Sequence, residues 1–324
     1  MTSKFNTVAV AISLTIGLSI IGALLLLGLR DRAPDRVAAS TIVAHAGSVA
    51  RFSGVLATAS AAEMQWPDVA QLTQRLGNPV ELADDLSVVY DHYAGSVNPL
   101  ERNIAYRAWS ACFPAFMGAD GNPVAVEQFA RAMPLDGLNN GLRLAAYSEL
   151  HKRCQRFFLL SHDEIIHASQ RQEDAWKKGE MLAPGELAMK HFLDGRDDEA
   201  LDVARRIVKS GDGYAIASLQ EYIHRMIAQK MEMQHLPNSE RSDLRGLAFA
   251  MAACQLGLDC RADSLTALLL CANGGQCAGT LTNRYLQALP NAADRDRAGR
   301  LADMTLAAIR GKDFSALLLD KTNR

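Results

Sequence analysis

A long uncharged segment near the start of the chain is the feature that most constrains its fold. No charged residue occurs from Phe5 to Leu29, and the most apolar part, Val8–Leu29, has 22 residues. As an α-helix rising 1.5 Å per residue, this part is about 33 Å long, which is enough to cross a hydrocarbon core of about 30 Å. A cleaved signal peptide has an apolar core of only about 7 to 15 residues. We therefore expect residues 1–29 to be an uncleaved transmembrane helix that anchors the chain in a membrane.

The composition changes after this segment. Residues 30–64 are rich in Ala, Ser, Val and Gly and have few large side chains, which is typical of a linker. We expect residues 65–324 to form the folded domain. The whole chain has 34 Lys plus Arg against 36 Asp plus Glu, a formal net charge of -2. Surfaces that bind nucleic acid are strongly basic, so we expect no nucleic-acid partner.

The local signals in the folded part are helical. Only 6% of the residues are aromatic, and no convincing run of alternating apolar and polar residues indicates a strand. Asparagine caps helices and proline suits the first helical position, so an Asn-Pro pair predicts a helix start. Such pairs occur at Asn78-Pro79, Asn98-Pro99 and Asn122-Pro123. The sequence therefore predicts an all-α fold.

Two of the predicted helices have an apolar face with three-to-four spacing, and each of these faces includes a cysteine. The positions are Ile104, Ala105, Ala108, Trp109 and Cys112 in the first helix, and Leu150, Cys154 and Phe158 in the second. We expect both cysteines to point inward.

Ser161 and Glu164 have the spacing of a capping box, which predicts a helix running through His167 toward Trp176. The segment from His162 to His167 also contains two His and two carboxylates. Zinc peptidases place their two His four residues apart, with a Glu beside the first, whereas here the interval is five and Asp163 takes that place. We therefore interpret this segment as the exposed first turn of a capped helix.

A short pattern recurs three times: a Gly, then an Asp, then an Ala three positions after the Asp. It occurs at Gly195, Asp197 and Ala200, at Gly211, Asp212 and Ala215, and at Gly311, Asp313 and Ala316. A helix that ends on a left-handed Gly, followed by one that starts on an Asp cap, has this signature. The small residue then lets the two helices pack closely.

The segment from Glu186 through Ala217 resembles the helix pairs of tetratricopeptide and Sel1-type repeat proteins, although their strict period is absent. The wider arrangement over Tyr90–Tyr285 resembles α-helical envelope proteins of Gram-negative bacteria. These carry an N-terminal anchor or signal, two helix-borne cysteines and a late cysteine cluster. The resemblance implies an irregular helical-hairpin domain, similar to α/α repeats, and it supplies no activity.

Six cysteines lie outside the apolar segment, and they allow 15 pairings. Cys254 and Cys271 each lie on an apolar helix face, are followed by Gly, and have a second cysteine six positions later. A helix that ends and doubles back brings such a pair within the Cα separation of about 4.4 to 6.8 Å that a disulfide needs. We expect bridges joining Cys254 to Cys260, Cys271 to Cys277, and Cys112 to Cys154. A zinc site on the four late cysteines, or free thiols, are the alternatives.

The expected location follows from two opposing signals. Lys4 precedes the apolar segment while Arg30, Arg32 and Arg36 follow it, and the positive-inside rule then places the bulk of the chain in the cytoplasm. Disulfides instead need an oxidising compartment. Giving the cysteines more weight, we expect a single-pass protein of the bacterial inner membrane with its domain in the periplasm; a cytoplasmic domain is the alternative.

No catalytic, cofactor-binding or metal-binding residues are expected. The solitary residues Glu149, His151, His191, His224 and His235 share no spacing with a nucleophile, and the chain has no phosphate loop, dinucleotide turn or nucleophile elbow. We therefore expect a binding or scaffold protein with a protein or peptide partner in the envelope. The alternative is an enzyme acting on peptidoglycan or glycans, with Glu149, Asp163 or Glu164 as acid or base.

Overall fold

The computed structural model describes residues 78–113, 116–117, 122–132, 137, 139–233 and 242–320. Within these ranges the protein is all-α, as predicted, with thirteen α-helices and one short 3-10 helix, η1. The elements are α3 (Leu86–Tyr93), α4 (Pro99–Ser110), α5 (Val126–Ala132), α6 (Asn140–Cys154), η1 (Phe157–Leu159), α7 (His162–Lys177), α8 (Pro184–Leu193), α9 (Asp197–Ser210), α10 (Gly213–Ala217), α11 (Gln220–Met233), α12 (Ser242–Cys254), α13 (Leu265–Gly274), α14 (Leu281–Gln287) and α15 (Ala292–Gly311).

The predicted anchor at residues 1–29 and the predicted linker at residues 30–64 lie outside the described residues, as does the start of the predicted domain. In the part of the chain that is described, no helix has both the length and the apolar character needed to span a membrane.

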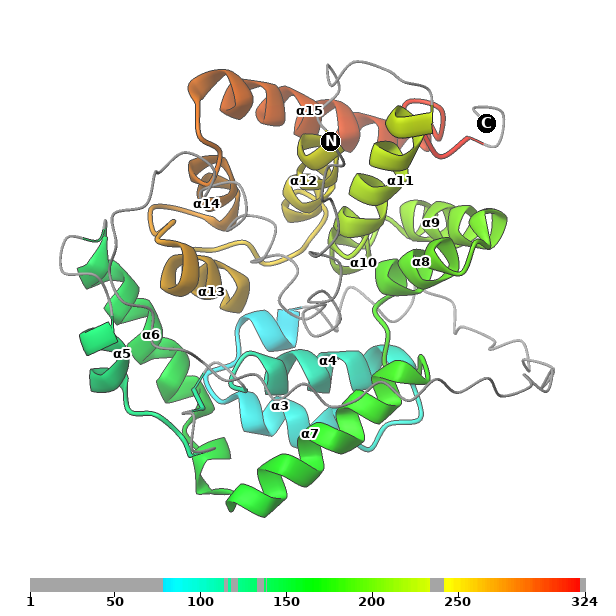
Figure 1. The fold of residues 1–324 in the computed structure, drawn as a ribbon. Helices are drawn as coiled ribbons and strands as arrows, with labels where there is room; N and C mark the ends of the chain where they lie inside the picture. Colours follow the sequence, from blue (N-terminus) through cyan, green and yellow to red (C-terminus); the bar gives the residue numbers. More distant parts are fainter. Residues whose placement is uncertain are drawn as a thin grey trace, which may run out of the picture.

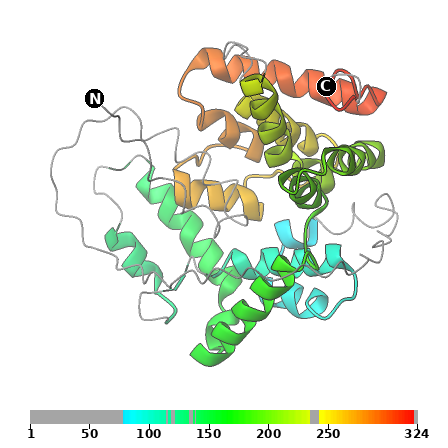
Figure 2. The ribbon, with the colours of Figure 1, turned by 45° about the vertical axis from the view of Figure 1, so that its right-hand side comes forward.

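The helices form two layers joined through α13 (Figure 1). Helices α3, α4 and α7 lie at the bottom of this view, and α15 lies across the top. Turning the molecule by 45° preserves this arrangement (Figure 2). In the upper layer α12 packs against α10, α11, α14 and α15, and α8 pairs with α9 as a helical hairpin. Helix α13 packs against α6 on one side and α14 on the other.

The two layers have different cores. The lower core is built around aromatic side chains, including Trp109, Phe113, Phe116 and Phe157. The upper core consists mainly of alanine and aliphatic residues from α8 to α12 and α15. A third, smaller cluster joins α12 to α13, α14 and α15.

Several predicted helix starts are confirmed by their caps. Asn98 precedes α4, and its side chain accepts a hydrogen bond from the backbone N–H of Leu100 at 3.0 Å. Ser161 and Glu164 form the predicted capping box at the start of α7. The predicted inward faces are also confirmed, because Cys112 and Cys154 are both fully buried.

The Gly-Asp-Ala pattern has its predicted geometry at one of three places. Gly211 has a positive φ of 67° and ends α9, and the side chain of Asp212 accepts a hydrogen bond from the N–H of Ala215 at 2.8 Å to start α10. At the first place Gly195 is left-handed, but Asp197 is already helical and is not the cap.

Three other predicted boundaries are wrong. The Asn-Pro pair at 122–123 opens no helix, because its proline forms an isolated bridge with Met117 and α5 begins only at Val126. Phe158 does not continue α6, which ends four residues earlier, and lies in η1 instead. Helix α15 ends on the left-handed Lys312 (φ 54°) and not on the preceding glycine.

The first Asn-Pro pair ties two distant segments together. The side chain of Asn78 donates to the carbonyl of Gly257 at 3.2 Å and accepts from the N–H of Asp259 at 3.0 Å. Asn78 is itself part of the short helical turn that it was predicted to cap. The amide therefore fixes this turn to the loop after α12.

Three disulfides join the cysteine pairs that the sequence analysis favoured: Cys112–Cys154, Cys254–Cys260 and Cys271–Cys277. Their Cα separations are 5.6, 5.5 and 4.4 Å. The first bridge links the end of α4 to the end of α6 and lies in the lower core. Three bridges in one chain point to an oxidising, extracytoplasmic location.

Candidate functional site

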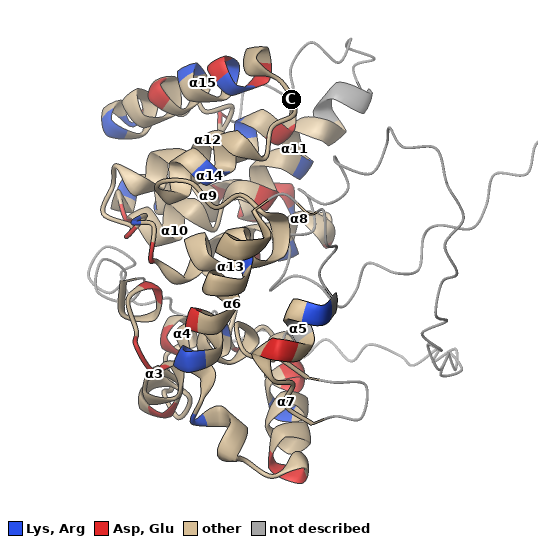
Figure 3. Ribbon diagram, turned by 90° about the vertical axis from the view of Figure 1, so that its left-hand side faces the viewer, with Lys and Arg blue, Asp and Glu red and all other residues tan. Residues whose placement is uncertain are grey.

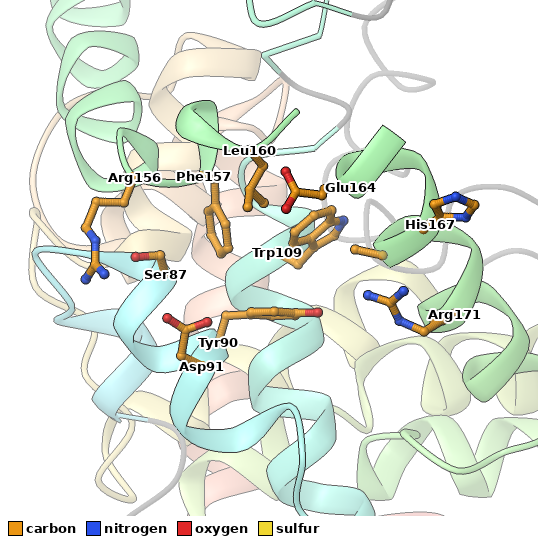
Figure 4. Close-up of a pocket in the computed structure, with 11 residues that line it drawn as sticks. Ser87, Tyr90, Asp91, Trp109, Arg156, Phe157, Leu160, Glu164, His167 and Arg171 are labelled. Carbon is orange, nitrogen blue, oxygen red and sulfur yellow. The ribbon is translucent and has the colours of Figure 1, made fainter. Parts of the chain in front are cut away.

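A pocket of about 410 Å³ lies between α3 and α7 (Figure 4). Its walls come from these two helices, and its floor comes from Tyr90 of α3, from α4 and from the η1 segment. The lining residues are Ser87, Tyr90 and Asp91 of α3, Glu164, His167, Ala168 and Arg171 of α7, Trp109 of α4, and Arg156, Phe157 and Leu160 around η1.

Helical spacing explains why these walls form. On α3 the wall residues lie three and four positions after Ser87, and on α7 they lie three, four and seven positions after Glu164, so each set lies on one helix face. The α7 wall starts in the capped first turn. There the N–H of Ser161 donates to Glu164 Oε2 at 2.7 Å, and the N–H of Glu164 donates to Ser161 Oγ at 3.4 Å. The capping box thus fixes both the start of α7 and the position of Glu164.

The floor is aromatic and closely filled. The ring centroids of Tyr90 and Trp109 are 5.2 Å apart, those of Trp109 and Phe157 are 5.2 Å apart, and those of Tyr90 and Phe157 are 5.6 Å apart. Phe113 also packs against Trp109, with 4.6 Å between the ring centroids. Trp109 and Phe157 are each only 3% exposed, whereas Tyr90 is half-buried. The floor therefore offers apolar edges and no open gap between the rings.

Four charged side chains line the pocket, and two of them are already engaged. Arg156 Nη1 lies 3.4 Å from Asp85 Oδ2. Glu164 accepts hydrogen bonds from Ser161, which hold the pKa of its carboxyl below the usual range. Asp91 and Arg171 have no ion-pair partner within the described residues. The guanidinium of Arg171 extends from α7 toward Trp109 and Tyr90 (Figure 4).

The inner face of α7 contains polar atoms that its own surroundings do not satisfy. Gln172 is 9% exposed, and both atoms of its side-chain amide are buried without a hydrogen-bond partner in the described part of the chain. The indole Nε1 of Trp176, one turn further on, is in the same situation. Each such group costs about 1–3 kcal/mol. Helix α7 also has only sparse contacts with the other helices.

A second polar cluster joins the two layers. Glu81 is fully buried, and its Oε1 lies 2.5 Å from Arg107 Nη2. The N–H and the hydroxyl of Thr266 donate to the same carboxylate at 2.9 and 2.8 Å. The guanidinium of Arg107 lies over the ring of Tyr214, 5.0 Å from its centroid. These contacts connect α4 to α10 and α13.

The same cluster continues to the start of α8. The hydroxyl of Tyr214 donates to Asn103 Oδ1, and Asn103 Nδ2 donates to the carbonyl of Met181 at 2.9 Å. Burial raises the pKa of the nearby Glu186 to about 7, against the opposing effects of the Ala183 N–H and of Arg107. Burial also raises the pKa of Tyr214 to about 12. Because these groups mainly bind one another, we interpret the cluster as a structural joint.

The carboxylates considered as acid or base do not converge. Glu149 accepts a hydrogen bond from Arg153 Nε at 3.0 Å on α6. Asp163 is exposed in the first turn of α7 and does not line the pocket. Glu164 does line it, but a general acid must hold a proton near neutral pH, and the lowered pKa of Glu164 favours the ionised form.

The solitary histidines are also spread over the fold. His151 packs on the ring of Phe158 at 4.7 Å, and His191 lies 3.5 Å from Glu199 on the α8–α9 hairpin. Burial lowers the pKa of both. His224 lies on α11, and His235 is outside the described residues. Within those residues no group of three or more His, Cys, Asp or Glu side chains could hold a metal ion.

No family model, curated protein or solved structure matches this chain. The assignment of the α3/α7 pocket as a candidate site therefore depends on its geometry alone. Sequence reasoning found the capping box that starts the α7 wall and the Trp109 face of α4, but it did not bring them together. One sequence signal could have indicated the α7 wall of the pocket: polar residues recur at positions 164, 167 and 171, on the helix face that includes Ala168.

Proposed function

We propose that this chain is a membrane-anchored binding protein of the bacterial envelope, and that the α3/α7 pocket receives part of a protein or peptide partner in the periplasm. The observation that carries the proposal is the composition of the pocket. It combines an apolar floor with an unengaged guanidinium, and its carboxylates are not arranged as an acid and base pair. Pockets with an apolar lining and a few placed polar groups are typical binding sites.

The location part of the proposal is supported by the three disulfides and by the apolar segment at Val8–Leu29. It predicts that alkylation of the full chain, denatured without reductant, labels none of the six cysteines. Reduction before alkylation should expose all six. Labelling of all six in the unreduced sample would contradict the proposed location.

Site-specific photocrosslinking in cells tests the binding part. A benzoylphenylalanine at Leu160, which lines the pocket, should crosslink a discrete partner. The matched control is the same probe at Met304, which is 60% exposed on α15 in the other layer. An adduct at Leu160 that is absent at Met304 supports the proposal. Identical adducts at both positions, or none at Leu160, would contradict it.

The mixed surface charge agrees with a protein partner more than with a polyanion. Basic and acidic segments are interspersed over the face in Figure 3, and α15 contains both. The lining of the pocket is mixed in the same way, with two arginines and two carboxylates.

A further inference from the structure

We propose that the α3/α7 pocket recognises the free C-terminal end of a peptide whose last side chain is large and apolar. This inference rests on the proposed binding function and deepens it by naming the ligand chemistry. In this arrangement the terminal carboxylate lies against Arg171, the side chain lies on the floor formed by Tyr90, Trp109 and Phe157, and a main-chain amide reaches Gln172.

Arg171 supplies the anion-binding group. It is exposed, it has no ion-pair partner within the described residues, and its guanidinium points toward the floor (Figure 4). A guanidinium binds a carboxylate through two parallel hydrogen bonds, which gives geometric specificity as well as attraction. The other arginine of the lining, Arg156, is already paired with Asp85. Arg171 is therefore the cation that a ligand can use without displacing a partner.

The floor supplies the side-chain site. The edges of Trp109 and Phe157, together with Leu160 and Ala168, present an apolar surface beside Arg171. A volume of about 410 Å³ is within the range of small-ligand sites. A large apolar side chain next to a carboxylate matches this arrangement.

Gln172 is the second, independent observation. It lies one helical turn after the lining residue Ala168 on the same face of α7, and it is not itself one of the lining residues. Both amide atoms are buried and lack a partner among the described residues. One donor and one acceptor side by side complement a peptide group, which also has one of each.

The same observations disfavour other ligands. A sugar ring stacks on an open aromatic face, but the faces of Trp109 and Phe157 are covered by their neighbours. A ligand with several phosphates would meet the carboxylates of Asp91 and Glu164 in the lining. A single carboxylate avoids this repulsion, because it meets only Arg171 at its end of the pocket.

The test uses the full chain in detergent micelles, labelled with 5-fluorotryptophan. The chain has three Trp, and the variants Trp109→Phe and Trp176→Phe assign the fluorine signals of Trp109, which lines the pocket, and of Trp176, which lies further along α7. Three probes are titrated: N-acetyl-Ala-Ala-Ala-Phe with a free carboxylate, its C-terminal amide, and N-acetyl-Ala-Ala-Asp-Phe amide. The third probe carries an internal carboxylate in place of the terminal one.

We expect the free acid to shift the signals of Trp109 and Trp176 and to bind at least tenfold more tightly than either amide. Arg171→Gln should abolish the difference between acid and amide. Arg206→Gln, at an exposed arginine of α9 in the other layer, should leave it unchanged. Gln172→Leu should weaken all three probes and keep the preference for the acid.

Equal affinity of the acid and its amide would overturn this inference while leaving the binding function in place, and so would equal affinity of the acid and the internal-Asp probe. Absence of any shift with all three probes would also overturn it. In that case the crosslink at Leu160 decides separately whether the pocket binds a partner of another chemistry.

Discussion

The cores of the two layers are filled by different kinds of residue. In the upper layer the helices approach so closely that glycine is required: a Cβ on Gly185 would lie 2.0 Å from the backbone oxygen of Ser218. In the lower layer large rings fill the core, and α7 has only sparse contacts with the other described helices. The α3/α7 pocket lies in the aromatic layer. We therefore place the proposed binding in the layer where one helix, α7, is incompletely packed.

The largest expected effect is the loss of the bridge in the aromatic layer. Cys112→Ser with Cys154→Ser opens a loop whose ends are 42 residues apart, which should lower the free energy of unfolding by about 4 kcal/mol. Cys254→Ser with Cys260→Ser opens a loop of six and should cost only about 2 kcal/mol. Urea unfolding followed by circular dichroism measures both. An equal loss in the two double variants would contradict the dependence on loop length.

The next effect concerns close packing in the upper layer. Gly185→Ala places a Cβ against the backbone of Ser218 and should destabilise the protein by about 3 kcal/mol. Gly299→Ala, on α15, meets nothing within 4 Å and should stabilise it by about 0.5–1 kcal/mol. Thermal unfolding of the two variants compares them directly. A neutral Gly185→Ala variant would contradict the close approach of α8 to the turn after α10.

The free energy of unfolding should depend on pH through Glu186, which lies in the joint between the layers. Its pKa is raised by burial from 4.5 to about 7, so the native state binds the proton more tightly than the unfolded state. Its contribution to stability is therefore complete below pH 4.5 and is lost as the pH rises to about 7. We expect a loss on the order of 2 kcal/mol, because solvent screens the half-buried carboxyl.

Urea unfolding of the wild type and of Glu186→Gln between pH 4.5 and 8 measures this contribution. In Glu186→Gln the free energy of unfolding should lack this part of the decline with rising pH. In Glu173→Gln, at an exposed glutamate of α7, the decline should remain. Parallel pH curves for the wild type and Glu186→Gln would show that burial does not shift this carboxyl.

The smallest effect is expected at the hydroxyl of Tyr214. Tyr214→Phe removes the hydrogen bond to Asn103 and leaves that amide oxygen unpaired between the layers. We expect a loss of about 1–2 kcal/mol in thermal unfolding. Tyr106→Phe, on the same helix as Asn103, is the matched control, because no hydrogen bond of its hydroxyl is part of the joint. An equal loss in both variants would argue against the joint.

The parts of the fold that could be predicted depend on neighbours in the sequence. The Asn98 cap, the capping box at Ser161 and the three cysteine pairs are short-range patterns or repeat one layout. The helix start predicted at 122–123 was wrong because its proline forms an isolated bridge with Met117. The pocket could not be predicted, because Tyr90, Trp109 and Arg171 come from three helices whose packing no local pattern specifies.

We propose that binding belongs to the layer in which α7 is incompletely packed. Hydrogen exchange of the full chain, followed by mass spectrometry with and without N-acetyl-Ala-Ala-Ala-Phe, tests this claim. Without the peptide, the amides of α7 should exchange faster than those of α12, because nine of the thirteen residues of α12 are buried against only three of the sixteen of α7. With the peptide, protection should increase in α3 and α7 and stay constant from α8 to α15. Protection confined to α8–α15, or an α7 that already exchanges as slowly as α12, would contradict the account.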